Sequence, residues 1–218
     1  MIELRDVVVA YDTRVILDSV NLTIKDGETL VILGGSGSGK STLLRLIIGL
    51  QRPTSGQIIV DGVDITTLSE EEFNKVRQKM GMVFQYSALF DSMSVGENVA
   101  FGLREHTNLS DDKIQHIVDE RLGWVGLSGY ESYMPNELSG GMKKRVSLAR
   151  AIALDPTLIL YDEPSSGLDP ITSGTISMLI RGMQERLGCT SIVVTHDMQS
   201  AFYVADRIAL LDKGKFIE

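Results

Sequence analysis

The sequence predicts an α/β protein with a parallel-sheet core, an antiparallel β sub-domain at the N-terminus and an inserted helical sub-domain. Short apolar strands alternate with amphipathic helices in the first and last thirds of the chain, which is typical of a parallel sheet. Residues 86–157 interrupt this alternation with apolar positions at helical spacing. All five prolines stand at the edges of expected elements, where a missing N–H is tolerated.

The N-terminal part is expected to be rich in strands. The turn KDGE, residues 25–28, separates two strands, and a glycine-rich loop then leads into a helix. Ser69 and Glu72 have the spacing of a capping box, which predicts that a helix begins there. The expected elements are strands over 3–11, 15–24 and 29–34, a helix over about 41–50, a strand over 57–60, a helix over about 69–79 and a strand over 80–85.

The insertion, residues 86–157, should be mainly helical. Ser94 and Glu97 form a second capping-box pattern, and apolar residues then recur at helical spacing. Strand and helix alternate again over 158–162, 171–187, 191–195, 198–205 and 208–211. We therefore expect one domain, in which residues 1–85 and 158–218 form the core with its β sub-domain and residues 86–157 form the helical sub-domain.

Composition excludes several classes of protein. The chain has 218 residues, of which 43% are apolar, enough for one domain with a substantial core. We expect no secretory signal and no transmembrane segment, since no apolar run approaches the roughly 20 residues that a spanning helix needs. Cys189 is the only cysteine, which argues against disulfides and cysteine metal sites and fits a reducing cytosol. The net charge of −8 argues against a nucleic-acid partner.

The stretch GGSGSGKST matches the phosphate-binding P-loop pattern between an expected strand and an expected helix. Main-chain N–H groups of such a loop surround phosphate oxygens, and the helix N-terminus favours an anion. Lys40 is expected to reach the β- and γ-phosphates of ATP, and the Ser41 hydroxyl to bind Mg²⁺. The expected ATP-binding residues of this loop are Gly34, Gly35, Ser36, Gly37, Ser38, Gly39, Lys40, Ser41 and Thr42. The core is therefore predicted to be a RecA-like P-loop NTPase.

Two adjacent carboxylates, Asp162 and Glu163, end the apolar run LILY. In P-loop ATPases an aspartate at the end of a second strand holds Mg²⁺, and Asp162 fits that role. Glu163 should point to the other side of the strand, where it can polarise the attacking water as general base. A pair of solvated acids is the alternative, which the nearby P-loop disfavours.

The segment ELSGGMKKR, residues 137–145, narrows the class of NTPase. Its LSGGM resembles the LSGGQ signature of ABC ATPases, and it precedes LILYDEP at the separation usual in that family. The remaining motifs follow in order along nearly the whole chain. Tyr11 resembles the A-loop aromatic that stacks on adenine, Gln85 the Q-loop glutamine, Asp169 the D-loop aspartate and His196 the switch histidine.

This resemblance implies a homodimer with shared nucleotide sites. The signature residues Ser139, Gly140, Gly141 and Met142 would bind the γ-phosphate of ATP held by the P-loop of the other subunit. Asp169 would lie at the dimer seam, and His196 would position the water for Glu163. The implied catalytic residues are Glu163, His196 and Gln85, the implied Mg²⁺ ligands are Ser41, Gln85 and Asp162, and Tyr11 would contact adenine.

Met142 stands where the common signature has glutamine. A thioether cannot donate the hydrogen bonds of an amide, whereas phosphate binding by the main chain should persist. With SALFDSMSVGENVAFGLREHT and DEPSSGLDPITS, this residue makes the chain resemble the ATPase subunit of Mla-type phospholipid transporters, which work with MCE-domain proteins. Lys143, Lys144 and Arg145 are expected to form a solvated helix face.

The resemblance implies an ATPase on the cytoplasmic face of the inner membrane that docks on a permease through residues around 87–104 and drives phospholipid transport. An MCE-domain protein would be a further partner. Two alternatives stay open. One is the ATPase of an importer for an amino acid or other small solute, and the other is a non-transport ABC ATPase, for example in iron–sulfur assembly.

Overall fold

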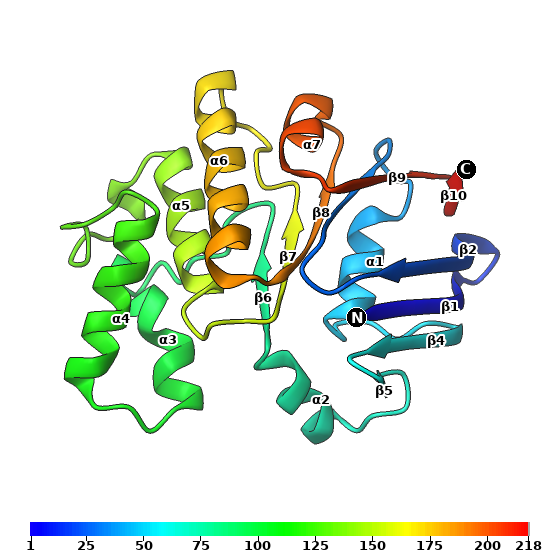
Figure 1. The fold of residues 1–218 in the computed structure, drawn as a ribbon, viewed down its shortest axis with the longest axis horizontal. Coiled ribbons are helices and arrows are strands. Elements are labelled where there is room, and N and C mark those ends of the chain that lie inside the picture. The colour runs from blue at the N-terminus through cyan, green and yellow to red at the C-terminus, as the bar shows by residue number, and fades with distance from the viewer. Residues whose placement is uncertain (218) are drawn as a thin grey trace.

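A six-stranded sheet forms the centre of the computed structural model, which describes residues 1–217 (Figure 1). Its strands pair in the order β10-β9-β3-β8-β7-β6, and all neighbours are parallel except β9 and β10. The strands are β3 (Thr29–Leu33), β6 (Met80–Val83), β7 (Leu158–Asp162), β8 (Thr190–Thr195), β9 (Arg207–Asp212) and β10 (Lys215–Ile217). The predicted parallel-sheet core is confirmed.

A second, antiparallel sheet is built from the N-terminal strands in the order β2-β1-β4-β5. These strands are β1 (Ile2–Tyr11), β2 (Arg14–Ile24), β4 (Ser55–Val60) and β5 (Val63–Asp64). The antiparallel β region is therefore present as predicted. The strands β5 and β10 were not expected, because segments of two or three residues are too short to show an alternating pattern.

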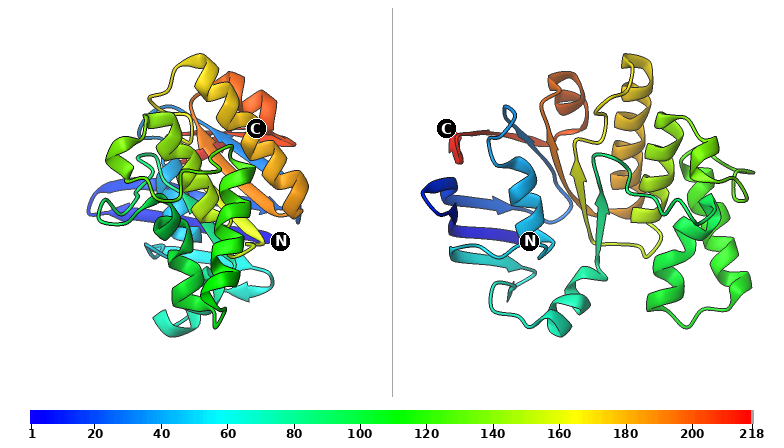
Figure 2. Two further views of the ribbon diagram at one scale, coloured as in Figure 1. Left: turned by 90° about the vertical axis from the view of Figure 1, so that its left-hand side faces the viewer. Right: turned by 180° about the vertical axis from the view of Figure 1, so that it is seen from behind.

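Both faces of the parallel sheet are covered, as its continuous apolar strands require. Successive side chains of a strand point to opposite faces. Leu30 and Ile32 of β3 therefore pack towards the antiparallel sheet, while Val31 packs on the other side. Helix α1 (Lys40–Ile47) lies between the two sheets (Figure 2, right). It ends earlier than expected, because Gly49 has φ +70°, a conformation that stops a helix.

Three helices of the insertion pack together at the end of the molecule opposite the antiparallel sheet (Figure 1). They are α3 (Val95–His106), α4 (Asp111–Trp124) and α5 (Gly140–Ala151), with the short 3₁₀ helix η1 (Pro135–Glu137) before α5. Ser94 caps α3 in a complete capping box, as the sequence predicts, and Ser69 does the same for α2 (Glu70–Arg77). The remaining helices are α6 (Pro170–Leu187) and α7 (Met198–Val204). Over residues 1–217, no helix combines the length and the apolar content needed to cross a membrane.

Candidate nucleotide site

The expected site residues lie on loops that leave the parallel sheet at one edge. The carboxyl ends of parallel strands meet at the same edge, where α/β proteins usually bind ligands. β3 runs into the P-loop, β7 ends at Asp162, and β8 ends one residue before His196. The fold therefore brings together motifs that are more than a hundred positions apart in the sequence.

The phosphate cradle, residues 34–42, has a backbone that requires glycine. Gly37 and Gly39 have φ values of +79° and +108°, which side-chain-bearing residues rarely adopt. A Cβ on Gly34 would lie 2.3 Å from the Leu211 carbonyl oxygen, whereas one on Gly35 would meet nothing within 4 Å. The cradle opens into a hollow of about 230 Å³ that Arg14 also lines.

Two features of the cradle fit a phosphate. Lys40 is only 7% exposed, and its Nζ donates hydrogen bonds to the carbonyl oxygens of Gly34 at 2.8 Å and Gly35 at 3.1 Å. This places a positive charge at the mouth of the loop. Ser38 Oγ is buried and has no hydrogen-bond partner within the described part of the chain. A buried hydroxyl without a partner is costly, and a bound phosphate oxygen would satisfy it.

The end of β7 meets the start of α1 through Ser41 and Asp162. Ser41 Oγ donates a hydrogen bond of 2.8 Å to Asp162 Oδ1, and Asp162 is only 8% exposed. A hydroxyl oxygen and a carboxylate oxygen beside a phosphate cradle are ligands that Mg²⁺ prefers. This pair therefore fits a divalent cation.

Glu163 contacts different partners from Asp162. Its Oε2 lies 2.9 Å from His196 Nδ1, and its Oε1 lies 3.6 Å from Lys40 Nζ. Glu163 has φ +46°, a strained value for a residue with a side chain, and its N–H bonds to the Val194 carbonyl at 2.9 Å. The turn at the end of β7 thus directs one carboxylate towards Ser41 and the next towards a histidine and the cradle lysine.

Other expected site residues lie outside this cluster. The Gln85 side chain donates to Ser166 Oγ at 3.4 Å, and Tyr11 is 55% exposed at the end of β1. Asp169 caps α6 by accepting hydrogen bonds from the Ile171 and Thr172 main chain, and its hydrogen bonds with Thr172 hold the pKa of its carboxyl below the usual value.

The signature residues stand at the start of α5. Ser139 accepts a hydrogen bond of 3.3 Å from the Met142 N–H, and Ser139 and Gly140 are exposed. Helices α5 and α1 lie apart, with β6, β7 and β8 between them (Figure 1). One chain therefore presents the cradle and the signature as two separate surfaces.

The expectation of a solvated face over residues 143–145 is wrong for Lys144. This side chain is buried, and its Nζ donates to the Gln85 carbonyl and lies 3.5 Å from the Glu163 carbonyl. Lys144 is one helical turn before Ser147 and Leu148, which are buried, so all three share the inward face of α5. That spacing was readable in the sequence, but the run of three basic residues obscured it.

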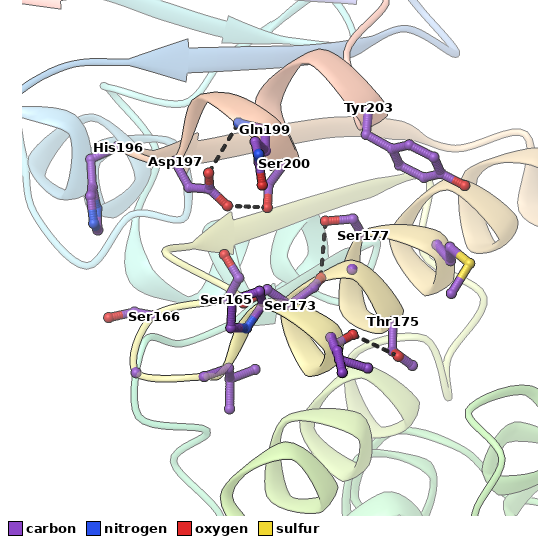
Figure 3. Close-up of a pocket in the computed structure, with 16 residues that line it drawn as sticks. Ser165, Ser166, Ser173, Thr175, Ser177, His196, Asp197, Gln199, Ser200 and Tyr203 are labelled. Atoms are coloured by element: carbon purple, nitrogen blue, oxygen red, sulfur yellow. Dashed lines mark hydrogen bonds between the residues drawn. The ribbon is translucent and has the colours of Figure 1, made fainter.

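A larger hollow, of about 700 Å³, adjoins the site without containing the cradle. Figure 3 shows it between the loop that carries Ser165 and Ser166, the first turns of α6, and α7 with Ser200 and Tyr203. His196 lies at its margin. Its lining includes neither Lys40 nor Ser41, which both line the smaller hollow, so the residues that fit a phosphate lie at the cradle.

The class of protein follows from the position of the cradle. A glycine loop that follows a parallel strand and opens a helix, with a lysine and a serine at its end, is the arrangement of P-loop NTPases. The model of the family described as ABC transporter matches residues 17–166.

Similarity to individual proteins extends further along the chain. The intermembrane phospholipid transport system ATP-binding protein MlaF of Haemophilus influenzae is 48% identical over 217 residues, which cover 100% of this chain and 82% of that protein. The methionine import ATP-binding protein MetN of Carboxydothermus hydrogenoformans is 48% identical over 202 residues, which cover 93% of this chain and 60% of that protein.

A solved structure agrees with these relatives. The ATP-binding cassette MJ0796, solved as a dimer in a post-hydrolysis state with ADP and Pi, is 36% identical, with a TM-score of 0.93, and the match covers 100% of this chain and 97% of that chain. This chain belongs to the ABC transporter family. The predicted ABC ATPase fold and the nucleotide-binding ATPase activity are confirmed.

Proposed function

We propose that this chain is the ATP-hydrolysing subunit of an intermembrane phospholipid transporter, held at the cytoplasmic face of the inner membrane. The observation that carries this proposal is the similarity to MlaF of Haemophilus influenzae over the entire chain. Met142 also supports the proposal, because it is one of the residues by which the chain resembles the Mla-type ATPases. MetN has the same sequence identity to this chain, 48%, over a slightly shorter stretch. The transported substrate is therefore what an experiment must decide.

The arrangement at the cradle supports specific roles for its residues. Lys40 would exchange the carbonyls of Gly34 and Gly35 for the β- and γ-phosphates of ATP. Glu163 would accept the proton of the attacking water, and its 2.9 Å contact with His196 would hold the carboxylate in place. A bound Mg²⁺ would neutralise charge on the phosphates, with Ser41, Asp162 and Gln85 as its ligands. Gln85 would have to leave Ser166 to take part.

A head-to-tail homodimer would complete each nucleotide site. The signature turn at Ser139 and Gly140 is exposed and lies away from the cradle of its own chain. The main-chain N–H groups at the start of α5 can bind an anion presented by a second copy. The dimeric structures of MJ0796 support this pairing. Asp169 and Tyr11 would then contact the partner subunit and adenine respectively.

A permease would dock at the junction between the core and the helical insertion. An apolar hollow of about 310 Å³ lies there, lined by residues of β6, α3, α5 and the loop after β6, which include Met82 on β6, Phe101 on α3 and Phe90 on the loop. Phe90 in its lining is 42% exposed, and Tyr86, on the same loop, is 87% exposed. Exposed aromatic side chains favour a protein partner, which supports the expected contact around residues 87–104.

Purification of the full complex from native membranes tests this function. An MCE-domain protein that co-purifies with the ATPase and the permease supports phospholipid transport, whereas a periplasmic solute-binding protein supports a small-solute importer. The purified complex should move labelled phospholipid between two vesicle populations only with ATP. The same complex with Glu163→Gln is the control. A soluble complex without any membrane partner would contradict the proposal.

A further inference from the structure

Lys144 places a buried positive charge behind the catalytic groups. It is 5% exposed, although its neighbours Lys143 and Arg145 are only half-buried. Burial lowers the pKa of the Lys144 ammonium, and the carboxylates of Asp162 and Glu163 nearby oppose that shift. A buried ammonium is costly unless hydrogen-bond acceptors surround it. Lys144 and its acceptors therefore belong to the packed interior of the protein and not to its solvated surface.

These contacts join two loops of the nucleotide site. Lys144 Nζ donates to the main-chain carbonyl of Gln85 and lies 3.5 Å from that of Glu163. The first carbonyl belongs to the loop after β6, and the second to the loop after β7. Since both acceptors are main-chain atoms, the lysine fixes the course of the chain at these points while both side chains stay free for chemistry.

The same helix holds the Gln85 loop, residues 85–88, at a second point. Arg150 donates hydrogen bonds to the Ser87 carbonyl at 2.9 Å and the Ala88 carbonyl at 2.7 Å. Ser87 and Ala88 have φ values of +63° and +47°. Such strained conformations persist only where surrounding contacts enforce them. The loop is therefore held to α5 at both of its ends.

We propose that Lys144 is a positioning residue for ATP hydrolysis. Its ammonium holds the Gln85 loop and the main chain of Glu163 in a fixed relation to α5, the helix that begins with the signature residues. Loss of this contact lets the Glu163 carboxylate leave its place beside His196 and Lys40, although neither the cradle nor the carboxylate itself has changed. The inference rests on the proposed role of Glu163 as general base.

The test compares substitutions of neighbouring lysines in the full chain. Lys144→Met keeps the length and removes the charge, Lys144→Arg keeps the charge, and Lys143→Met is the matched control. We expect Lys144→Met to lower kcat about ten-fold with KM for ATP within about two-fold, since a positioning contact acts in the transition state and not in nucleotide binding. Lys144→Arg should restore most of kcat, and Lys143→Met should match the wild type.

Several outcomes overturn the inference. Wild-type kcat in Lys144→Met does so, and so does an equal loss of kcat in Lys144→Met and Lys144→Arg, which would make the residue merely structural. If Lys144→Met does not fold, Lys144→Gln replaces it, because glutamine is polar but uncharged and its amide is one bond too short to hold both carbonyls. Unchanged kcat in that variant overturns the inference, and a lowered kcat with unchanged KM supports it.

A parallel measurement separates this inference from the proposed function. If Glu163→Gln loses turnover and Lys144→Met does not, only the role of Lys144 fails. If Glu163→Gln retains near-normal turnover, the assignment of the general base fails, whatever Lys144→Met does.

Discussion

The phosphate cradle and the junction between α5 and the Gln85 loop are held in place by different means. In the cradle, neighbouring residues determine the shape: glycines at +79° and +108°, and a lysine bonded to carbonyls five and six positions earlier. At the junction, Lys144 and Arg150 hold carbonyls that lie 59 to 63 positions earlier in the chain. A local sequence pattern thus encodes the first region, and only the folded sheet creates the second.

Glu163→Gln is expected to have the largest effect, because Glu163 belongs to both regions. Its carboxylate faces the cradle, and its carbonyl faces Lys144. Glutamine keeps the shape but cannot accept a proton, so turnover should fall by about 10²–10⁴, the usual contribution of a general base. ATP binding should remain. Single-turnover ATPase assays and a nucleotide-binding titration measure the two quantities. Near-normal turnover would remove Glu163 from this role.

Lys40→Ala tests the cradle alone. The variant removes the cradle ammonium and should weaken ATP binding by about 100-fold, the effect of losing one or two charge-assisted hydrogen bonds to phosphate. The junction should be unaffected, so hydrogen exchange of the Gln85 loop should match that of the wild type. Fluorescent-nucleotide titration gives the affinity, with Lys143→Ala as control. Tight ATP binding by Lys40→Ala would contradict the assignment of the cradle.

This contrast also explains how much could be predicted from the sequence. Strand β7 lies at the residues predicted for it, and the P-loop and both capping boxes were found, since each depends on residues close together in the chain. The partners of Lys144 were missed, because its acceptors are main-chain carbonyls of the loops after β6 and β7, which carry no side-chain signal. The short strands β5 and β10 were missed because they pair with neighbours that a pattern of two or three residues cannot reveal.

Gly34→Ala and Gly35→Ala examine the local geometry of the cradle. A Cβ on Gly34 would clash with the Leu211 carbonyl, which is backbone and cannot move aside easily, while Gly35 faces open space. Overpacking of this kind typically costs about 1–3 kcal/mol, so Gly34→Ala should lower the free energy of unfolding by that amount. Gly35→Ala should change it little. Urea denaturation of the nucleotide-free protein measures both, and equal stabilities would contradict the rigid cradle.

The two capping serines give the smallest expected effect. They compare α2, which precedes the insertion, with α3, the first helix of the insertion, through one shared motif. Ser94 and Ser69 each accept a hydrogen bond from the N–H three residues later and complete a capping box. Loss of such a cap costs about 1 kcal/mol where the helix end cannot fray separately. Helix α3 buries five side chains, among them Val95 and Val99, whereas α2 buries only Phe73.

Ser94→Ala should therefore lower the free energy of global unfolding by about 1 kcal/mol, and Ser69→Ala by less than half of that, because opening α2 removes only one side chain, Phe73, from the core. Urea denaturation followed by the fluorescence of Trp124, the single tryptophan, measures both variants. A larger loss of stability in Ser69→Ala than in Ser94→Ala would mean that α2 is coupled to the core more tightly than its burial indicates. It would also mean that α3 can open locally, although the hydrogen bonds of Lys144 and Arg150 hold α5 of the same insertion to the Gln85 loop.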